Sequence, residues 1–156
     1  MSELIDQTDR RILAEIQRDA TLSVEQMASR INLSRNACWR RMRRLEDDGY
    51  IRERVALIDA EKLGLGLTAF VFVRTSTHDP GWLKRFRDAV ASFPEIVGVY
   101  RTSGDLDYVL RVRIADVKAY DRLYQRLIAK VPLADVSASF VMEDIKETTA
   151  VPVEIR

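Results

Sequence analysis

Cysteine and histidine are almost absent from this chain of 156 residues, which contains one of each, Cys38 and His78. A single cysteine excludes a disulfide bond within the chain and fits a reducing compartment. With so few thiols and imidazoles, a zinc site built from these residue types alone is implausible. We therefore expect no bound metal and no cofactor.

Long hydrophobic runs and an excess of charge of one sign are also lacking. No apolar segment approaches the roughly 18–20 residues that a membrane-spanning helix needs. The first residues, Met1–Asp6, lack the basic and apolar regions of a secretory signal. We therefore expect a cytoplasmic protein with no membrane partner. The composition, 47% hydrophobic and 31% charged, is that of a folded protein.

What the sequence does contain is a local concentration of arginine. Five arginines and no acidic residue occur from Ser34 to Arg44, and the acidic residues return at positions 46–48. The overall net charge of +1 gives no hint of a nucleic-acid partner. A basic cluster of this kind is nevertheless typical of a surface that binds phosphate. The alternative is a solvated helix face, as most charge runs are.

The N-terminal third of the chain carries helix signals. Asp6 can cap a first helix, and Ser23 with Gln26 fits a capping box for a second. Ser34 can cap a third helix, which should stop at Gly49. Apolar residues recur at helical spacing in all three segments. The positions expected to be buried are Ile12, Leu13 and Ile16, then Val24, Met27, Ala28 and Ile31, then Cys38, Met42 and Leu45.

A tight turn at Asn32 and Leu33 before the arginine-rich third helix is typical of a helix-turn-helix. Residues near the start of such a helix contact base edges, so Arg35 and Asn36 are candidates for reading guanine and adenine. The later arginines are candidates for phosphate contacts, and Trp39 either contacts a sugar or packs under a wing. The complete set of expected DNA-binding residues is Ser23, Ser34, Arg35, Asn36, Trp39, Arg40, Arg41, Arg43 and Arg44.

The periodicity changes in the second half of the chain. Residues 52–58 alternate weakly, which predicts a wing or linker strand, and the pattern breaks around Gly64 and Gly66. Asp79 and Asp116 are candidate N-caps of two further helices. The expected strands are 68–75, 96–102, 107–114 and 136–142, and the expected helices begin after Asp79 and after Asp116.

The resulting order, βαββαβ, is that of a ferredoxin-like unit. We therefore predict an α+β protein with an N-terminal winged helix-turn-helix and a C-terminal βαββαβ ferredoxin-like domain. The expected domains are residues 1–60 for DNA binding, residues 66–145 for the second domain, and residues 146–156 as a C-terminal tail.

Three segments resemble the Lrp/AsnC family of leucine-responsive or feast/famine regulators. They are LSRNACWRRMRRLEDDGYI (33–51), SGDLDY (103–108) and FVMEDIKETTAVPV (140–153), and the resemblance covers essentially the whole chain. It implies transcription regulators that dimerise through the C-terminal (RAM) domain, often assemble into octamers and bind an amino acid near the contacts between dimers. It also implies that the effector site comprises Arg101, Thr102, Ser103, Gly104, Asp105, Asp107, Tyr108, Ser137, Ser139 and Phe140.

The chemistry of the glycine-containing turn agrees with that implication. Such a turn exposes backbone N–H groups that can hold a carboxylate, and an aspartate can meet an ammonium group. Without the resemblance, an ordinary hairpin turn is the simpler interpretation of Gly104 and Asp105, because both residues favour turns. The interpretation of Asp105 and Asp107 as a catalytic acid–base pair is less favoured still.

Two departures from the family pattern bear on the effector. Ala37 stands where the family often has proline, and Arg101-Thr102 stands where the leucine-responsive member is apolar and β-branched. Leucine is therefore not the expected ligand. Residues 55–70 and the tail look most like the branch that senses cysteine, so L-cysteine is the first candidate effector.

Two other functions stay open. Sirohaem decarboxylases resemble this family in both domains, but that enzyme function leads one to expect a histidine near the pocket, whereas His78 is the only histidine here. An architectural protein that compacts DNA without a specific promoter is the other alternative. The expected function is a sequence-specific DNA-binding transcription regulator, not an enzyme, that responds to a small amino acid.

Overall fold

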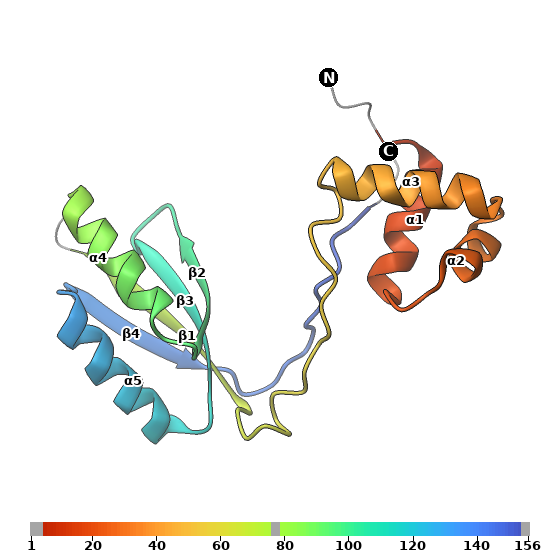
Figure 1. The fold of residues 1–156 in the computed structure, drawn as a ribbon. Coiled ribbons are helices and arrows are strands. Elements are labelled where there is room, and N and C mark those ends of the chain that lie inside the picture. Colours follow the sequence, from red (N-terminus) through yellow and green to blue (C-terminus); the bar gives the residue numbers. More distant parts are fainter. Residues whose placement is uncertain (1–4, 76–78, 154–156) are drawn as a thin grey trace. The chain divides into compact units, whose positions relative to one another are not determined.

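The computed structural model describes residues 5–75 and 79–153, so His78 lies outside the described residues. The chain divides into two compact units (Figure 1). Residues 1–57 and 146–156 form the first unit, and residues 58–145 form the second. Residues 146–156, which the sequence predicts as a separate tail, thus group with the first unit. Among the described residues, no helix has the length and apolar character needed to span a membrane.

The first unit is built on the helices α1 (Gln7–Arg18), α2 (Val24–Ile31) and α3 (Arg35–Asp47), coloured red to orange in Figure 1. The capping signals explain where each helix starts. The side chains of Asp6, Ser23 and Ser34 accept hydrogen bonds from the backbone of the first turn, and the first two belong to complete capping boxes. Helix α2 ends at Asn32, whose φ of 59° lets the chain turn directly into α3.

The three helices enclose one apolar core, as the helical spacing predicts. Ile16 and Val24 pack at its edge, partly exposed. The expected core is otherwise confirmed. The buried members are Ile12, Leu13, Met27, Ala28, Ile31, Cys38, Met42 and Leu45.

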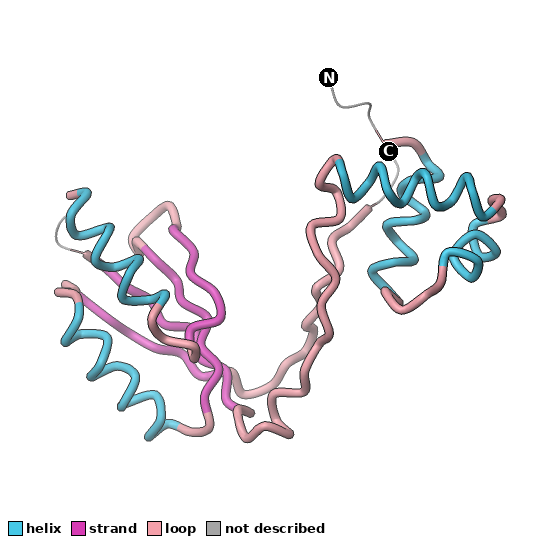
Figure 2. Tube along the Cα trace, in the orientation of Figure 1, coloured by secondary structure: helices cyan, strands magenta, loops and turns pink. Residues whose placement is uncertain are grey.

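The prediction of a wing or linker strand in residues 52–58 is wrong. These residues form neither helix nor strand (Figure 2). Val55, Leu57 and Ile58 are 65%, 73% and 70% exposed. A strand needs a hydrogen-bonded neighbour and a buried face, and within the described chain this segment gains neither.

The second unit has the expected βαββαβ order. Its strands are β1 (Leu67–Arg74), β2 (Ile96–Arg101), β3 (Tyr108–Ile114) and β4 (Asp135–Phe140), and its helices are α4 (Pro80–Ala91) and α5 (Val117–Lys130). They form one sheet in the order β2-β3-β1-β4, with every neighbouring pair antiparallel. Both helices lie on the same side of the sheet (Figure 1). The predicted strand ends differ from the observed ones by at most two residues.

Alternation along the strands gives the sheet two different faces. Ala69, Val71 and Val73 of β1 are buried with Leu110 and Val112 of β3, facing the helices. On the other face, the side chains of the intervening positions, apart from the buried Thr68, are partly buried or exposed, since no described helix covers them. That open face carries Phe70, Phe72, Val109, Arg111, Arg113, Ser137 and Ser139.

Candidate nucleic-acid interface and effector turn

Helix α3 presents a polar, exposed face opposite its buried stripe. The stripe of Cys38, Met42 and Leu45 holds the helix against α1 and α2. Trp39, next to this stripe, is 55% exposed. A helix anchored on one side and open on the other can enter a major groove. Among the sequence-predicted residues, those exposed are Ser23, Ser34, Arg35, Asn36, Trp39, Arg40 and Arg43.

The remaining two arginines, Arg41 and Arg44, point elsewhere. Asp9 of α1 is fully buried, and its carboxylate accepts hydrogen bonds from both guanidinium groups. Arg41 Nη1 lies 2.8 Å from Asp9 Oδ1 and 2.7 Å from Asp6 Oδ2. These hydrogen bonds raise the pKa of Arg41. Arg41 and Arg44 therefore hold α3 against α1 through Asp9. The sequence did not predict this role.

Helical spacing in the sequence signals this role for one of the two arginines. Arg41 comes three residues after the buried Cys38, and Arg44 immediately precedes the buried Leu45. Arg41 therefore borders the apolar stripe, whereas Arg44, about 100° from Leu45 around the helix, is not distinguished from Arg43 by spacing. Asp9 lies at the third position of α1, where its carboxylate also accepts the N–H of Asp6 in a capping box.

Arg35, the candidate for base recognition, is paired with an acid of α2. Its Nε donates to Glu25, and the two side chains are 68% and 60% exposed. An exposed pair of this kind stabilises little and exchanges readily with solvent or another anion. Arg35 can therefore leave Glu25 for a base or a phosphate.

Trp39 borders a hollow of about 440 Å³ beside α3. Arg43 and Arg54 line the same hollow on either side of Glu46. Arg54 lies 2.5 Å from Glu46, whereas Arg43 is held more loosely, 3.6 Å from Glu46 and 3.8 Å from Asp47. Trp39 is thus an accessible aromatic surface in a hollow that two arginines also line, which suits contact with a sugar-phosphate backbone.

The turn between β2 and β3 is fixed by hydrogen bonds to its neighbours. Gly104 adopts φ +112°, which other residues rarely do. Thr102 closes the turn, because its N–H donates to the carbonyl of Asp107 at 2.9 Å and its Oγ1 to the carbonyl of Leu106 at 2.6 Å. The Asp107 carboxylate accepts the N–H of Thr75 at 2.8 Å. Asp107 therefore holds the turn against the end of β1.

Asp105 is the acidic residue of this turn whose carboxylate faces solvent. Its backbone carbonyl accepts a hydrogen bond from Arg74 at 2.9 Å, while its exposed carboxylate has no bonded partner among the described residues. The amides of Ser103 and Gly104 likewise face no acceptor within the described chain. The turn thus offers an unpaired carboxylate beside unpaired N–H groups, and Arg101 and Thr102 are exposed next to it.

The other predicted effector residues are more scattered. Ser137 and Ser139 lie on the open face of β4, and β1 separates that strand from β3 by roughly 10 Å. Tyr108 and Phe140 face the helices instead. Tyr108 is 7% exposed with its ring 4.7 Å from that of Phe86, and the ring of Phe140 packs edge-on against Tyr120 at 5.3 Å. Within one chain, therefore, only residues 101–107 of the predicted effector site lie together.

A helix-turn-helix with an exposed arginine face, joined to a ferredoxin-like unit with an open polar turn, defines a DNA-binding regulator with a ligand-binding domain. Residues 5–52 match the family described as winged helix-turn-helix DNA-binding. Residues 68–151 match the Lrp/AsnC ligand binding domain. The chain belongs to the Lrp/AsnC family of transcription regulators.

Named relatives and solved structures also support membership of the Lrp/AsnC family. The chain is 49% identical to the DNA-binding transcriptional activator DecR of Escherichia coli K12, over 97% of this chain and 100% of the relative. An AsnC family regulator from Agrobacterium tumefaciens is 50% identical with a TM-score of 0.92, covering 96% of this chain and 97% of that one. A transcriptional regulator of Neisseria meningitidis, solved with L-methionine, is 31% identical with the same TM-score and coverage.

Proposed function

We propose that this protein is a sequence-specific regulator whose occupancy of promoters depends on a small amino acid, with L-cysteine as the first candidate. The observation that carries the effector half is the turn of residues 101–107, where an unpaired carboxylate stands beside unpaired amides. A zwitterionic ligand needs both. We further propose that the protein acts in the cytoplasm and catalyses no reaction.

On DNA, the exposed start of α3 enters the major groove. Arg35 and Asn36 read base edges, while Arg40 and Arg43 contact phosphates and Trp39 packs against the backbone. Ser23 and Ser34 stand at the N-termini of α2 and α3, where a free N–H can meet a phosphate. Arg41 and Arg44 contribute less, because both already hold Asp9.

Dimerisation brings two such helices to successive major grooves, about 34 Å apart. We propose that the open face of the sheet forms the dimer, since it carries the partly exposed aromatic residues Phe70 and Phe72. Four dimers assemble into an octamer, in keeping with the family resemblance. In that assembly Ser137 and Ser139 approach the turn of another subunit, which accounts for their separation within one chain.

In the effector site, the ligand ammonium pairs with Asp105 and its carboxylate with the amides of Ser103 and Gly104. Asp107 positions the turn, since one of its oxygens is bonded to Thr75. The neighbour from Neisseria meningitidis was solved with L-methionine, so the ligand screen includes methionine beside cysteine. The effector shifts the balance between assemblies, and a coupling of about 1–3 kcal/mol is typical of such systems.

The first experiment is binding to a labelled fragment of the gene's own upstream region, with excess competitor DNA at two salt concentrations. A specific regulator forms a discrete complex that resists competitor and weakens as salt rises. Equal competition by bulk DNA would instead support the architectural alternative. No complex at either salt would contradict DNA binding altogether.

Two variants then separate base recognition from phosphate contact. Arg35→Ala should reduce the preference for matched over scrambled sites, by roughly tenfold if a bidentate base contact is lost. Arg43→Ala should weaken both sites about equally and lower the salt dependence. Equal losses for the two variants on both sites would contradict these assignments.

The effector assignment is tested by isothermal titration with L-cysteine, L-methionine and L-leucine. Asp105→Asn should remove the binding of L-cysteine, the first candidate effector, whereas Asp116→Asn, which alters a helix cap in the same domain, should retain it. Unchanged binding by Asp105→Asn would remove that residue from the site.

A further inference from the structure

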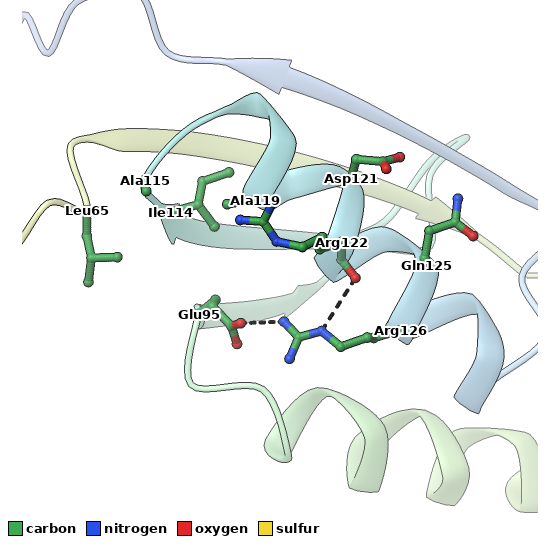
Figure 3. A pocket seen from close by; sticks show the side chains of 9 residues that line it. All are labelled: Leu65, Glu95, Ile114, Ala115, Ala119, Asp121, Arg122, Gln125 and Arg126. Carbon is green, nitrogen blue, oxygen red and sulfur yellow. Dashed lines mark hydrogen bonds and ion pairs between the residues drawn. The ribbon is translucent and has the colours of Figure 1, made fainter.

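A hollow of about 700 Å³ lies at the end of the sheet remote from the effector turn (Figure 3). One wall is Glu95, which immediately precedes β2, and another is the part of α5 from Ala119 to Arg126. Strand β2 has six residues, so at 3.3 Å per residue the hollow and the turn lie about 20 Å apart. The hollow is therefore separate from the proposed effector site and is formed by one chain.

The carboxylate of Glu95 has one oxygen that accepts no hydrogen bond among the described residues. One carboxylate oxygen pairs with Arg126, whereas Oε2 is buried and has no hydrogen-bond partner among the described residues. Burial favours the neutral acid, but the hydrogen bond from Arg126 holds the pKa of Glu95 below its usual value. The group is thus an anion at neutral pH. A buried acceptor without a donor is unfavourable, so a donor brought by a ligand would be stabilised there.

Arg122 supplies the opposite charge. In Figure 3 its side chain extends towards Ile114 and Ala119, while Asp121 and Gln125 project from the other side of α5. Arg122 is exposed and has no ion-pair partner among the described residues. Its guanidinium is therefore available to a carboxylate, for which it offers a planar pair of donors.

Besides the polar residues Asp121, Gln125 and Arg126, the hollow has an apolar part. Leu65, Ile114, Ala115 and Ala119 line the hollow, and their small or aliphatic side chains leave room for a short hydrocarbon group. The arrangement offers an anion, a cation and an aliphatic surface within one cavity. These features match the ammonium, carboxylate and side chain of an aliphatic amino acid.

We propose that this hollow is a second ligand site, which takes a small zwitterion with an aliphatic side chain. The ammonium donates to Glu95 Oε2, the carboxylate pairs with Arg122, and the side chain covers Ile114 and Ala119. Binding there fixes the start of α5 against the segment that leads into β2. The proposal does not depend on the turn, because the two sites share no residue.

The test is a titration of the full-length Asp105→Asn protein with L-leucine, followed by NMR of 13C-labelled alanine and isoleucine methyl groups. The Asp105→Asn background excludes effects of ligand bound at the turn. We expect saturable shifts at Ile114, Ala115 and Ala119. Isopentylamine and 4-methylpentanoate, which each retain one charge of leucine, should bind at least roughly tenfold more weakly, since each loses one charge-assisted pair.

Arg122→Gln should weaken leucine binding by a similar factor, whereas Lys118→Gln, an exposed change of the same kind on the same helix, should not. Neither change removes a buried side chain, so both variants are expected to fold. The absence of saturable shifts at the three methyl groups would overturn the proposal, as would equal binding by wild-type and Arg122→Gln forms. Failure of the turn as an effector site would leave these shifts unaffected.

Discussion

Five arginines of one helix divide into two kinds by what surrounds them. Arg41 and Arg44 meet the buried Asp9, whereas Arg35, Arg40 and Arg43 face solvent. Charge counting cannot make this distinction, because all five arginines carry the same charge. It follows that mutations within one basic cluster should separate into losses of stability and losses of DNA affinity.

Glu25→Gln should strengthen DNA binding severalfold. The substitution frees Arg35 from its ion pair and removes a carboxylate that repels nearby phosphates. Folding should change little, because an exposed pair contributes at most about 1 kcal/mol. Fluorescence anisotropy at two salt concentrations would measure the gain, with Glu61→Gln as a control outside the first unit. Unchanged or weaker DNA binding would show that Arg35 does not leave Glu25 for DNA.

Asp9→Asn should destabilise the first unit by about 2–4 kcal/mol, because it leaves two guanidinium groups facing a neutral amide in a partly buried site. Hydrogen exchange of peptides from α1 and α3 would measure the loss of protection. Asp47→Asn removes an exposed acid of α3 and should change exchange little. Equal protection in the wild-type and Asp9→Asn forms would contradict the structural role of this carboxylate.

At the scale of helices and strands, the sequence predicts correctly those features that depend on neighbouring residues. The caps at Asp6, Ser23 and Ser34 are read from neighbouring residues, and each helix begins where its cap predicts. The strand expected at residues 52–58 failed because a strand depends on a partner that no local pattern supplies. Tyr108 and Phe140 were grouped with the turn by resemblance, although strand alternation faces both towards the helices.

Among the connections between elements, Asn32 is the position most open to test, since its φ of 59° lets α2 end and α3 begin three residues later. Asn32→Ala should cost about 1 kcal/mol, because a β-carbon without a local hydrogen bond disfavours this conformation. Asn32→Gly should be nearly neutral, as glycine adopts it freely. Chemical denaturation of the two variants side by side would measure the difference, and equal stability would contradict a strained turn.

At the scale of the whole molecule, the chain enters its second unit after residue 57 and returns to the first at residue 146. In the returning segment, Val153 packs against the core of the three helices. The Gln17 amide accepts the N–H of Val151 at 2.6 Å and donates to the Val151 carbonyl at 3.1 Å. The sequence could not predict this contact, because it joins residues 134 positions apart and involves no regular structure.

Removal of residues 146–156 should therefore loosen the DNA-binding unit while leaving the ferredoxin-like unit folded. Two hydrogen bonds at about 0.5–1.5 kcal/mol each and the partial burial of one valine amount to roughly 2–4 kcal/mol. Hydrogen exchange should then rise in α1 and remain unchanged in β1 and β3.

Point variants identify which contact matters. Gln17→Ala and Val153→Ala should each reproduce part of this loss, whereas Val151→Ala should not, because Val151 is 64% exposed and its two hydrogen bonds use only the backbone. If the truncated protein shows unchanged protection in α1, the returning segment contributes nothing to the unit. If protection falls, the DNA-binding unit is completed by residues that follow the ligand-binding domain in the chain.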